Sequence, residues 1–150
     1  MFGPPGRAYV YLVYGMYHCL NVVTEPEDRP AAVLVRAVEP LSGLDEMRAA
    51  RQAGRGRAVV PDSRLASGPG LVCSAFSITR ADDGIDLLNP HSELHLVRVE
   101  GDDPLPIAAG PRVGVDYAPE PWRSIPWRFY VPGNASVSHA RTTAPRRAAR

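Results

Sequence analysis

Two apolar runs on either side of a glycine constrain the fold of this chain more than any other feature. Residues 8–13 read A-Y-V-Y-L-V, and residues 16–23 read M-Y-H-C-L-N-V-V. Both runs are rich in the β-branched and aromatic side chains that favour strands. Tyr14-Gly15 lies between them and is a turn candidate, because glycine accepts a positive φ. The sequence therefore predicts a β-hairpin close to its first residue.

One face of this hairpin is predicted to carry two aromatic rings and an amide. Residues two apart in a strand share a face. If the chain turns at residues 14–16, the odd positions of both arms share a face, namely Tyr9, Tyr11, Cys19 and Asn21. Such a surface suits stacking and hydrogen bonding with a planar heterocycle. Simple packing of a sheet is the alternative, and a register slip of one residue would disperse the set.

The rest of the chain is punctuated by 16 prolines and 13 glycines, which argues against long helices. We expect a mixed α/β (α+β) fold: a single domain with a mostly antiparallel, curved, barrel-like sheet, a protruding hairpin and short flanking helices. The nearly all-apolar segment 31–38 is expected to be a central strand. The other expected elements are a helix from Ser42 or Asp45 to about Ala53, a helix over residues 71–78 with Pro69 near its start, and strands over residues 93–100, 112–115 and 127–131.

Charge and cysteine content limit the classes of function. The formal net charge is +1 and all 17 cationic side chains are arginines, so a nucleic-acid contact would need local clustering of charge. Cys19 and Cys73 lack metal-ligand spacing and are expected to be reduced core residues. There is no apolar run of membrane-span length and no signal-peptide pattern, which predicts a cytoplasmic protein. The arginine-rich segment 139–150 is expected to be a disordered tail that follows a domain over residues 1–138.

Several segments, in order and spacing, resemble the alkyladenine (3-methyladenine) DNA glycosylases. The segment Y-V-Y-L-V-Y-G-M-Y-H-C-L-N is similar to the signature hairpin of that family. The further matching segments are V-L-V-R-A-V-E-P at 33–40, S-G-P-G-L-V-C at 67–73, P-R-V-G-V-D-Y-A at 111–118, P-W-R-F-Y-V-P-G-N at 126–134 and V-S at 137–138. The resemblance covers most of residues 1–138.

This resemblance implies a monofunctional enzyme of base excision repair. Such an enzyme flips alkylated or deaminated purines (3-methyladenine, hypoxanthine or ethenoadenine) out of duplex DNA and hydrolyses the N-glycosidic bond, which leaves an abasic site. It needs no metal and no organic cofactor. Double-stranded DNA with a damaged purine is the implied partner, and a bacterial, nucleoid-associated monomer is expected.

The resemblance also implies roles for particular residues. Tyr14 matches the tyrosine that fills the space of the extruded nucleotide, and Tyr11 matches the tyrosine that stacks on the flipped base, with Tyr9 beside it. Asn21 matches the pocket asparagine that discriminates against normal purines. Arg36 matches the arginine beside the nucleophilic water, although an ion pair with Glu39 would also explain its place in an apolar strand.

A second group of matching residues is expected to contact DNA: Met16, Tyr17, Gly68, Gly70 and Arg112. The amides that follow Gly68 could receive a phosphate, but Leu71 stands where the family often has a lysine. Arg112 and Arg128 could contact phosphate or brace the fold, and bracing is favoured.

The family's general base is a glutamate in an E-x-E-A-Y strand, which precedes the part that this sequence matches. No E-x-E-A-Y occurs in the 150 residues, so we expect these residues to be inactive alone and to leave a sheet edge exposed. A start codon upstream, a truncated gene and a lesion-binding pseudoenzyme would each explain this, and the first is favoured. Outside the family, the tyrosines would suit an oligonucleotide-binding barrel that uses them as a stacking platform.

Overall fold

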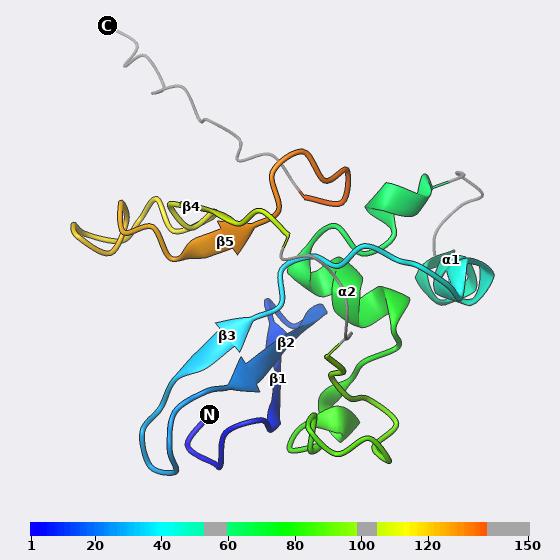
Figure 1. The fold of residues 1–150 in the computed structure, drawn as a ribbon, viewed down its shortest axis with the longest axis horizontal. Helices are drawn as coiled ribbons and strands as arrows, with labels where there is room; N and C mark the ends of the chain where they lie inside the picture. Colours follow the sequence, from blue (N-terminus) through cyan, green and yellow to red (C-terminus); the bar gives the residue numbers. More distant parts are fainter. Residues whose placement is uncertain (53–59, 99–104, 138–150) are drawn as a thin grey trace, which may run out of the picture. The chain divides into compact units, whose positions relative to one another are not determined.

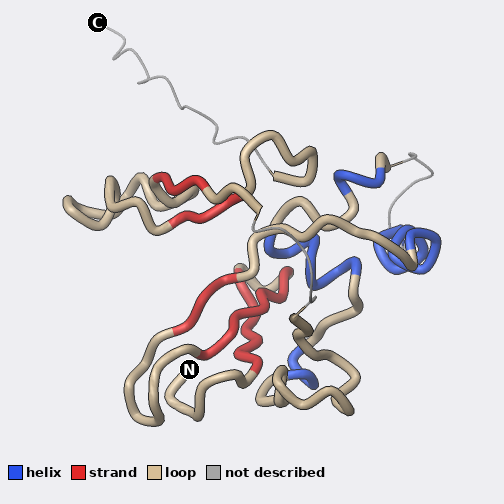
Figure 2. Tube along the Cα trace, in the orientation of Figure 1, coloured by secondary structure: helices blue, strands red, loops and turns tan. Residues whose placement is uncertain are grey.

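A computed structural model describes residues 1–52, 60–98 and 105–137, and the chain divides into two compact units, Met1–Asp102 and Asp103–Arg150 (Figure 1). The first unit holds a three-stranded antiparallel sheet and two α-helices, and the second holds a two-stranded antiparallel sheet. The expected mixed α/β fold with antiparallel sheets is confirmed (Figure 2). The three strands of the first unit form an open sheet rather than a closed barrel.

The predicted hairpin is present. Strand β1 covers Ala8–Val13 and strand β2 covers Tyr17–Val23, and they pair so that Tyr9 lies opposite Asn21. Between the strands, Tyr14 and Gly15 have φ values of 54° and 68°, and the Met16 N–H donates to the Val13 carbonyl at 3.1 Å. Both residues adopt left-handed backbone in the tight turn, and Val13 pairs with Tyr17, so Met16 belongs to the connection. The partners Tyr9–Asn21 and Tyr11–Cys19 confirm the predicted register.

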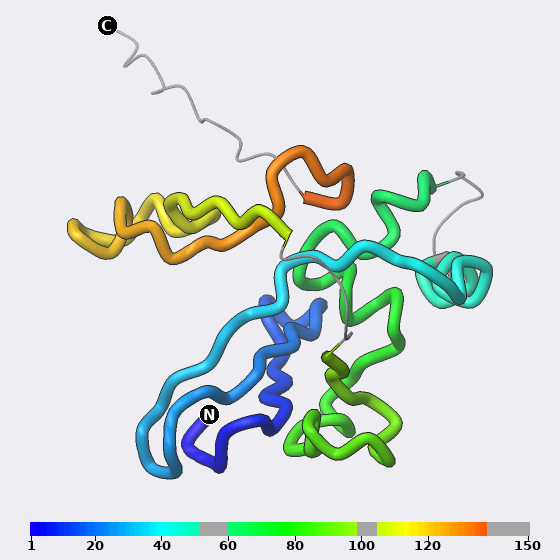
Figure 3. Tube along the Cα trace, in the orientation of Figure 1, coloured from blue at the N-terminus to red at the C-terminus, as the bar shows by residue number. Residues whose placement is uncertain are grey.

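Strand β3, Ala32–Leu34, is shorter than expected and lies at an edge, because the order in the sheet is β1-β2-β3. The prediction of a central strand over residues 31–38 was wrong. After β3, the Val35 N–H still donates to the Leu20 carbonyl at 3.0 Å, but the Val38 N–H donates to Ala66 at 3.2 Å, so the chain has left the sheet (Figure 3). Val35 and Val38 pack against buried residues of the helical region. This packing explains why residues 31–38 are apolar although no described strand pairs with the far side of β3.

Both predicted helices are present. Helix α1 covers Leu44–Gln52, and Met47 is its buried residue; the expected end at Ala53 lies outside the described residues. Helix α2 covers Pro69–Ala75 with proline in its first turn, where the missing N–H costs nothing. Two short 3₁₀ helices, Asp62–Arg64 and Arg80–Asp82, lie in the connections.

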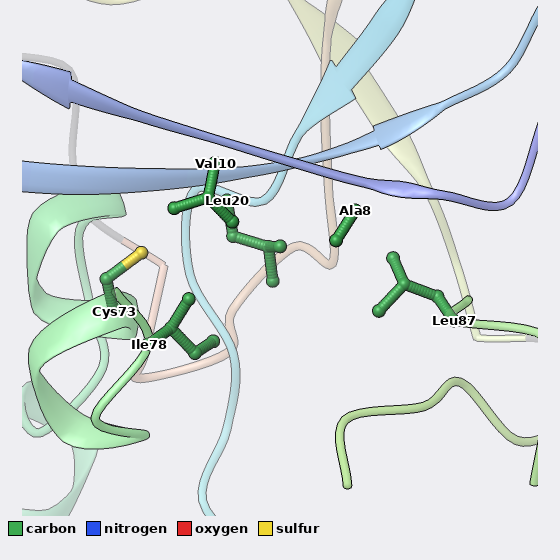
Figure 4. Packing of buried hydrophobic residues seen from close by; sticks show 6 residues of the cluster. All are labelled: Ala8, Val10, Leu20, Cys73, Ile78 and Leu87. Atoms are coloured by element: carbon green, nitrogen blue, oxygen red, sulfur yellow. The ribbon is translucent and has the colours of Figure 1, made fainter. Parts of the chain in front are cut away.

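The core lies on the even-numbered face of the hairpin. Ala8, Val10 and Leu20 pack with residues that follow along the chain, namely Cys73, Ile78 and Leu87 (Figure 4). A second buried cluster joins α1 to α2 and consists of Met47, Leu65, Ala66, Val72 and Ala75. Helix α2 therefore contributes to both clusters, and the odd-numbered face of the hairpin lies on the other side of the sheet from the first.

The outer edge of β1 is covered at Ala8 and Val10, whereas β3 pairs with β2 alone among the described strands, so the expectation of an exposed edge stays a prediction. The Ala8 N–H donates to Ile85 O at 2.8 Å, and the Gly84 N–H donates to Ala8 O at 2.9 Å. At the next outward position, the Val10 N–H donates to Asp83 Oδ1 and Arg80 Nη1 donates to Val10 O, both at 2.8 Å. An ion pair of 3.8 Å joins Arg80 to Asp83, so two side chains replace a neighbouring strand at Val10.

In the second unit, strand β4 covers Ala108–Gly110 and pairs with strand β5, Arg128–Tyr130. The strand expected over residues 127–131 is confirmed by β5. The strand expected over 112–115 was wrong, because Pro111 ends β4 and Gly114 adopts a positive φ of 80° in a turn. Residues 93–98 are not a strand either. The Leu96 N–H donates to the Leu87 carbonyl at 2.7 Å, but this bond does not extend into a ladder of strand pairs.

Some expectations fall on residues outside the described part of the chain: residues 99 and 100, the loop 54–57 and the tail 139–150. Among the described helices, none is long and apolar enough to cross a membrane.

Candidate functional site

The odd-numbered face of the hairpin carries two stacked tyrosine rings. The ring centroids of Tyr9 and Tyr11 lie 5.3 Å apart with an angle of 28° between the planes. Both side chains come from β1 and are partly buried, so neither ring is wholly covered. Their partners across the hairpin are Asn21 and Cys19, which are each 6% exposed. The structure therefore brings together the four residues that the alternation predicted.

The amide of Asn21 is held in one orientation by the backbone around it. Its Nδ2 donates to Tyr9 O at 3.0 Å and to Cys19 O at 3.4 Å. Two carbonyl acceptors require the nitrogen of the amide, so Oδ1 must be turned away from them. Among the described residues no group donates to this oxygen, which leaves it as an acceptor for a ligand. The sequence alone could not show which end of the amide is available.

Arg36 lies close to the same face. Burial raises the pKa of the Cys19 thiol, and the nearby positive charge of Arg36 partly opposes that rise. Arg36 is itself half-buried after the end of β3, which agrees with the partial burial expected from its apolar context. Arg36 and Glu39 both take part in other interactions, so neither charge is isolated. Their pairing with each other stays a prediction.

The tip of the hairpin projects away from the packed residues. Tyr14 is 87% exposed, and Met16 and Tyr17 are exposed as well. A tyrosine with φ of 54° is in the left-handed region, which costs free energy for any residue with a Cβ. An exposed aromatic side chain in that conformation adds nothing to packing, so it is a candidate for contact with another molecule.

Gly70 and Tyr17, both expected at the DNA, lie against each other. A Cβ added at Gly70 would come within 3.1 Å of Cβ and Cδ1 of Tyr17. The glycine therefore lets the first turn of α2 approach the hairpin close to its turn. Sequence reasoning missed this packing role, for which the only sign was a glycine inside a helix. Gly68 precedes α2 in extended backbone, and its phosphate-binding role stays a prediction.

Arg112 belongs to the second unit, where it contacts the backbone and an aromatic ring of the same unit. Its Nη2 donates to Trp122 O at 3.2 Å, and its guanidinium lies 5.7 Å from the ring centre of Trp127. The two tryptophan rings lie 5.6 Å apart. Arg128 similarly lies over Tyr130 at 4.5 Å. The predicted contact of Arg112 with DNA is not tested by these contacts and stays a prediction.

Within the described residues, no group of three or more histidine, cysteine or acidic side chains could hold a metal ion. What the first unit offers is instead a stacked aromatic pair, a fixed amide with an available oxygen, a nearby guanidinium and an exposed tyrosine at a hairpin tip. These groups suit the binding of a flat, polar ring.

Comparison with known proteins agrees with this chemistry. Residues 1–135 match a family model described as Methylpurine-DNA glycosylase (MPG). A protein of Bacillus cereus (strain G9842), named "Putative 3-methyladenine DNA glycosylase", is 45% identical over 142 residues. Proteins with the same name from Bacillus thuringiensis (strain Al Hakam) and Bacillus anthracis (strain CDC 684) are 44% identical over 140 residues. Each alignment covers 92% of this chain and 68% of the relative.

Proposed function

Because the chain belongs to the methylpurine-DNA glycosylase family, we propose that its hairpin reads a damaged purine flipped out of duplex DNA. The family acts on DNA as a hydrolase in DNA repair, and 3-methyladenine is in the name of the relatives. The observation that carries the proposal is the shared face of Tyr9, Tyr11 and Asn21, with Tyr14 exposed at the tip of the same hairpin. The residues proposed to contact the flipped base and the tyrosine proposed to insert into the duplex thus belong to the same hairpin.

The two tyrosines supply the stacking surface. Tyr11 stacks on the flipped base, and the ring of Tyr9 stacks against that of Tyr11 at 5.3 Å between centroids. Alkylation at a purine ring nitrogen gives the base a positive charge, and a cation gains from contact with the face of an aromatic ring. This favours 3-methyladenine over the neutral bases hypoxanthine and ethenoadenine.

Asn21 excludes normal purines by its bulk. Its Nδ2 is already used by two carbonyls, so the amide does not present a donor that would repel the amino group of a normal base. Discrimination by Asn21 therefore rests on the space that its side chain occupies, because two hydrogen bonds hold it in place and the residue is only 6% exposed.

Tyr14 acts as the wedge. A base can be cleaved from its sugar only after it leaves the stack, and an aromatic ring in its place restores part of the lost stacking. At 87% exposure the ring of Tyr14 is free of the protein core. The neighbouring Met16 and Tyr17 would then meet the sugar–phosphate backbone beside it.

Arg36 positions the water at the sugar but does not activate it. Hydrolysis needs a general base and an anion near the developing positive charge of the sugar, and arginine supplies neither. The E-x-E-A-Y glutamate of the family does not occur in these 150 residues. We propose that residues 1–150 bind the lesion as a monomer and cleave it at least about 10²-fold more slowly than a protein that contains the glutamate.

The test compares binding and cleavage on matched DNA. Duplexes with one ethenoadenine or hypoxanthine, the undamaged duplex and the lesion-bearing single strand are titrated with the full chain. Tighter binding to the lesion duplex than to either control supports the proposal, and strand breaks are expected only after alkali. Equal affinity for damaged and undamaged duplex would overturn it. Tightest binding to the single strand would favour the stacking-platform alternative.

A further inference from the structure

A groove of about 370 Å³ opens beside the turn end of the hairpin, and the wall that α2 and residues 77–79 form has no role in the proposed function. One wall is the start of β2 with the preceding turn residue, and the other is α2 with the segment that follows it; the end of α1 closes one side. The groove therefore adjoins the wedge, because Met16 follows the Tyr14-Gly15 turn directly. The lining residues that bear on its function are Met16, Tyr17, His18, Arg51, Ser74 and Ser77.

The lining has hydrogen-bond donors and no acidic side chain. Within the described residues, the ring of His18 and the hydroxyls of Ser74 and Ser77 have no hydrogen-bond partner. The hydroxyl of Thr79 is already engaged, because it accepts from the Ala81 N–H and donates to Asp82. Arg51 adds a positive charge, which its bonds to the carbonyls of Arg64 and Leu65 keep in place. Such a set suits an anion.

Ser77 occupies a backbone position at which glycine would be more stable. Helix α2 ends with a bond from Ile78 N–H to Cys73 O at 2.8 Å, which is the Schellman pattern, and Ser77 is its left-handed residue with φ of 55°. Ile78 and Cys73 are both buried in the first core cluster, so this turn is firmly held. A serine there retains a strain that glycine would remove, and its side chain is exposed in the groove.

We propose that this groove binds a phosphate group of the DNA strand beside the flipped nucleotide, with Ser77 Oγ, Ser74 Oγ and His18 as donors. The inference rests on the proposed function, since insertion of Tyr14 would bring the strand that flanks the lesion against Met16 and Tyr17. A phosphate contact of this kind carries no sequence information and fixes the position of the protein on the duplex. The strain at Ser77 is then the cost of placing a hydroxyl at the DNA.

The first test separates the hydroxyl from the backbone. Ser77→Gly removes both the hydroxyl and the strain, so it should raise the melting temperature and yet weaken binding to an ethenoadenine duplex about 3- to 10-fold. Ser77→Ala removes the hydroxyl but keeps the strain, so it should weaken binding equally without the gain in stability. Ser42→Ala, which removes an exposed hydroxyl outside the groove, should leave affinity unchanged. Unchanged affinity in both Ser77 variants would overturn the inference.

The second test asks whether the partner is a phosphate. Single phosphates that flank the lesion are replaced by neutral methylphosphonates, and the affinity of wild type and Ser77→Gly is measured for each duplex. At one position the two changes should be non-additive, because they remove the same contact. Additive losses at every position would overturn the inference while leaving lesion reading intact. Wild type that fails to prefer the lesion duplex would instead overturn the proposed function, and the groove inference with it.

Discussion

Tyr9 and Asn21 lie directly opposite each other in the hairpin, and Asn21 Nδ2 donates to the Tyr9 carbonyl at 3.0 Å. The residue that would select the base is thus bonded to the backbone of the strand that carries the stacking rings. A shift of β1 against β2 would break this bond and the ring geometry together. The side chain of Asn21 therefore has a structural role as well as the proposed selective one.

Replacement of Asn21 should separate these two roles. Asn21→Leu removes the side-chain donor that the carbonyls of Tyr9 and Cys19 share and should lower the free energy of unfolding by about 0.5–1.5 kcal/mol. Asn21→Asp should cost more, because carboxylate oxygens would face the same carbonyls. Asn21→Ala should also narrow the difference in affinity between lesion and undamaged duplexes. Urea midpoints and duplex titrations measure these effects, and an unchanged midpoint in Asn21→Leu would contradict the structural role.

Tyr14 should matter for DNA and not for folding. Tyr14→Ser removes an exposed ring, so the melting temperature should stay within a degree or two while lesion binding weakens about 10-fold or more. Tyr14→Phe should bind nearly as well as wild type. Tyr117→Ser is the matched control, because Tyr117 is also 87% exposed but lies in the second unit. Equal binding by Tyr14→Ser and wild type would rule out the wedge.

The contact between Gly70 and Tyr17 predicts that Gly70→Ala changes stability in opposite directions with and without the Tyr17 side chain. Alanine favours a helix over glycine by about 1 kcal/mol, but a Cβ at Gly70 would press on Tyr17 at 3.1 Å. The crowding should cost about 1–3 kcal/mol, so Gly70→Ala should be destabilising in wild type. In a Tyr17→Gly background, which removes both the Cβ and the ring, the same substitution should be stabilising. Denaturant unfolding of the four proteins measures this, and stabilisation in both backgrounds would show that Tyr17 yields freely.

Asp83 should stabilise the sheet through Val10. Asp83→Ala leaves the Val10 N–H at the edge of β1 without its acceptor, and the expected loss is about 1–2 kcal/mol. Asp83→Asn keeps an oxygen at that place and should lose less, since the exposed ion pair with Arg80 contributes little. The alanine variant should also associate more readily, because a free strand edge can pair with a second chain. Urea midpoints and light scattering provide the two readouts.

Cys73 predicts how stability changes at alkaline pH. Burial, together with nearby Cys19, raises the pKa of the Cys73 thiol from 9.0 to about 11. Because the pKa of Cys73 is higher in the folded state than in the unfolded state, the thiol's contribution to the free energy of unfolding is complete below pH 9.0. It is lost as the pH rises towards 11. The urea midpoint should therefore fall over this range, and Cys73→Ala should show a smaller fall despite its lower stability. Equal slopes for the two proteins would contradict the assignment.

The elements that could be predicted from the sequence are those with local signals. Runs of β-branched and aromatic residues around a Tyr-Gly turn predicted β1 and β2, and Pro69 predicted the start of α2. The features that could not be predicted concern partners distant in sequence. Val10 and Asp83 are 73 residues apart, and nothing in the apolar run after residue 31 distinguishes packing against helices from pairing with strands on both sides.

The same division holds within the candidate site. The shared face of Tyr9, Tyr11 and Asn21 followed from the period of a strand, because a hairpin of known turn has only one register. The available oxygen of Asn21 and the left-handed backbone of Ser77 did not, since both depend on how neighbouring carbonyls and a helix end are placed in space. The identity of a residue therefore does not predict the orientation of its side chain or its backbone conformation at such positions.

The left-handed backbone at Tyr14 limits which substitutions selection would accept at this position. Selection for folding alone would favour glycine or asparagine at that site, since both adopt φ of 54° at little cost. Selection for insertion into DNA favours a large ring, and β-branched side chains satisfy neither demand. In lineages that no longer repair DNA with this protein, codon 14 should therefore be among the first to drift, and its spectrum of replacements would show the loss of function before the core residues change.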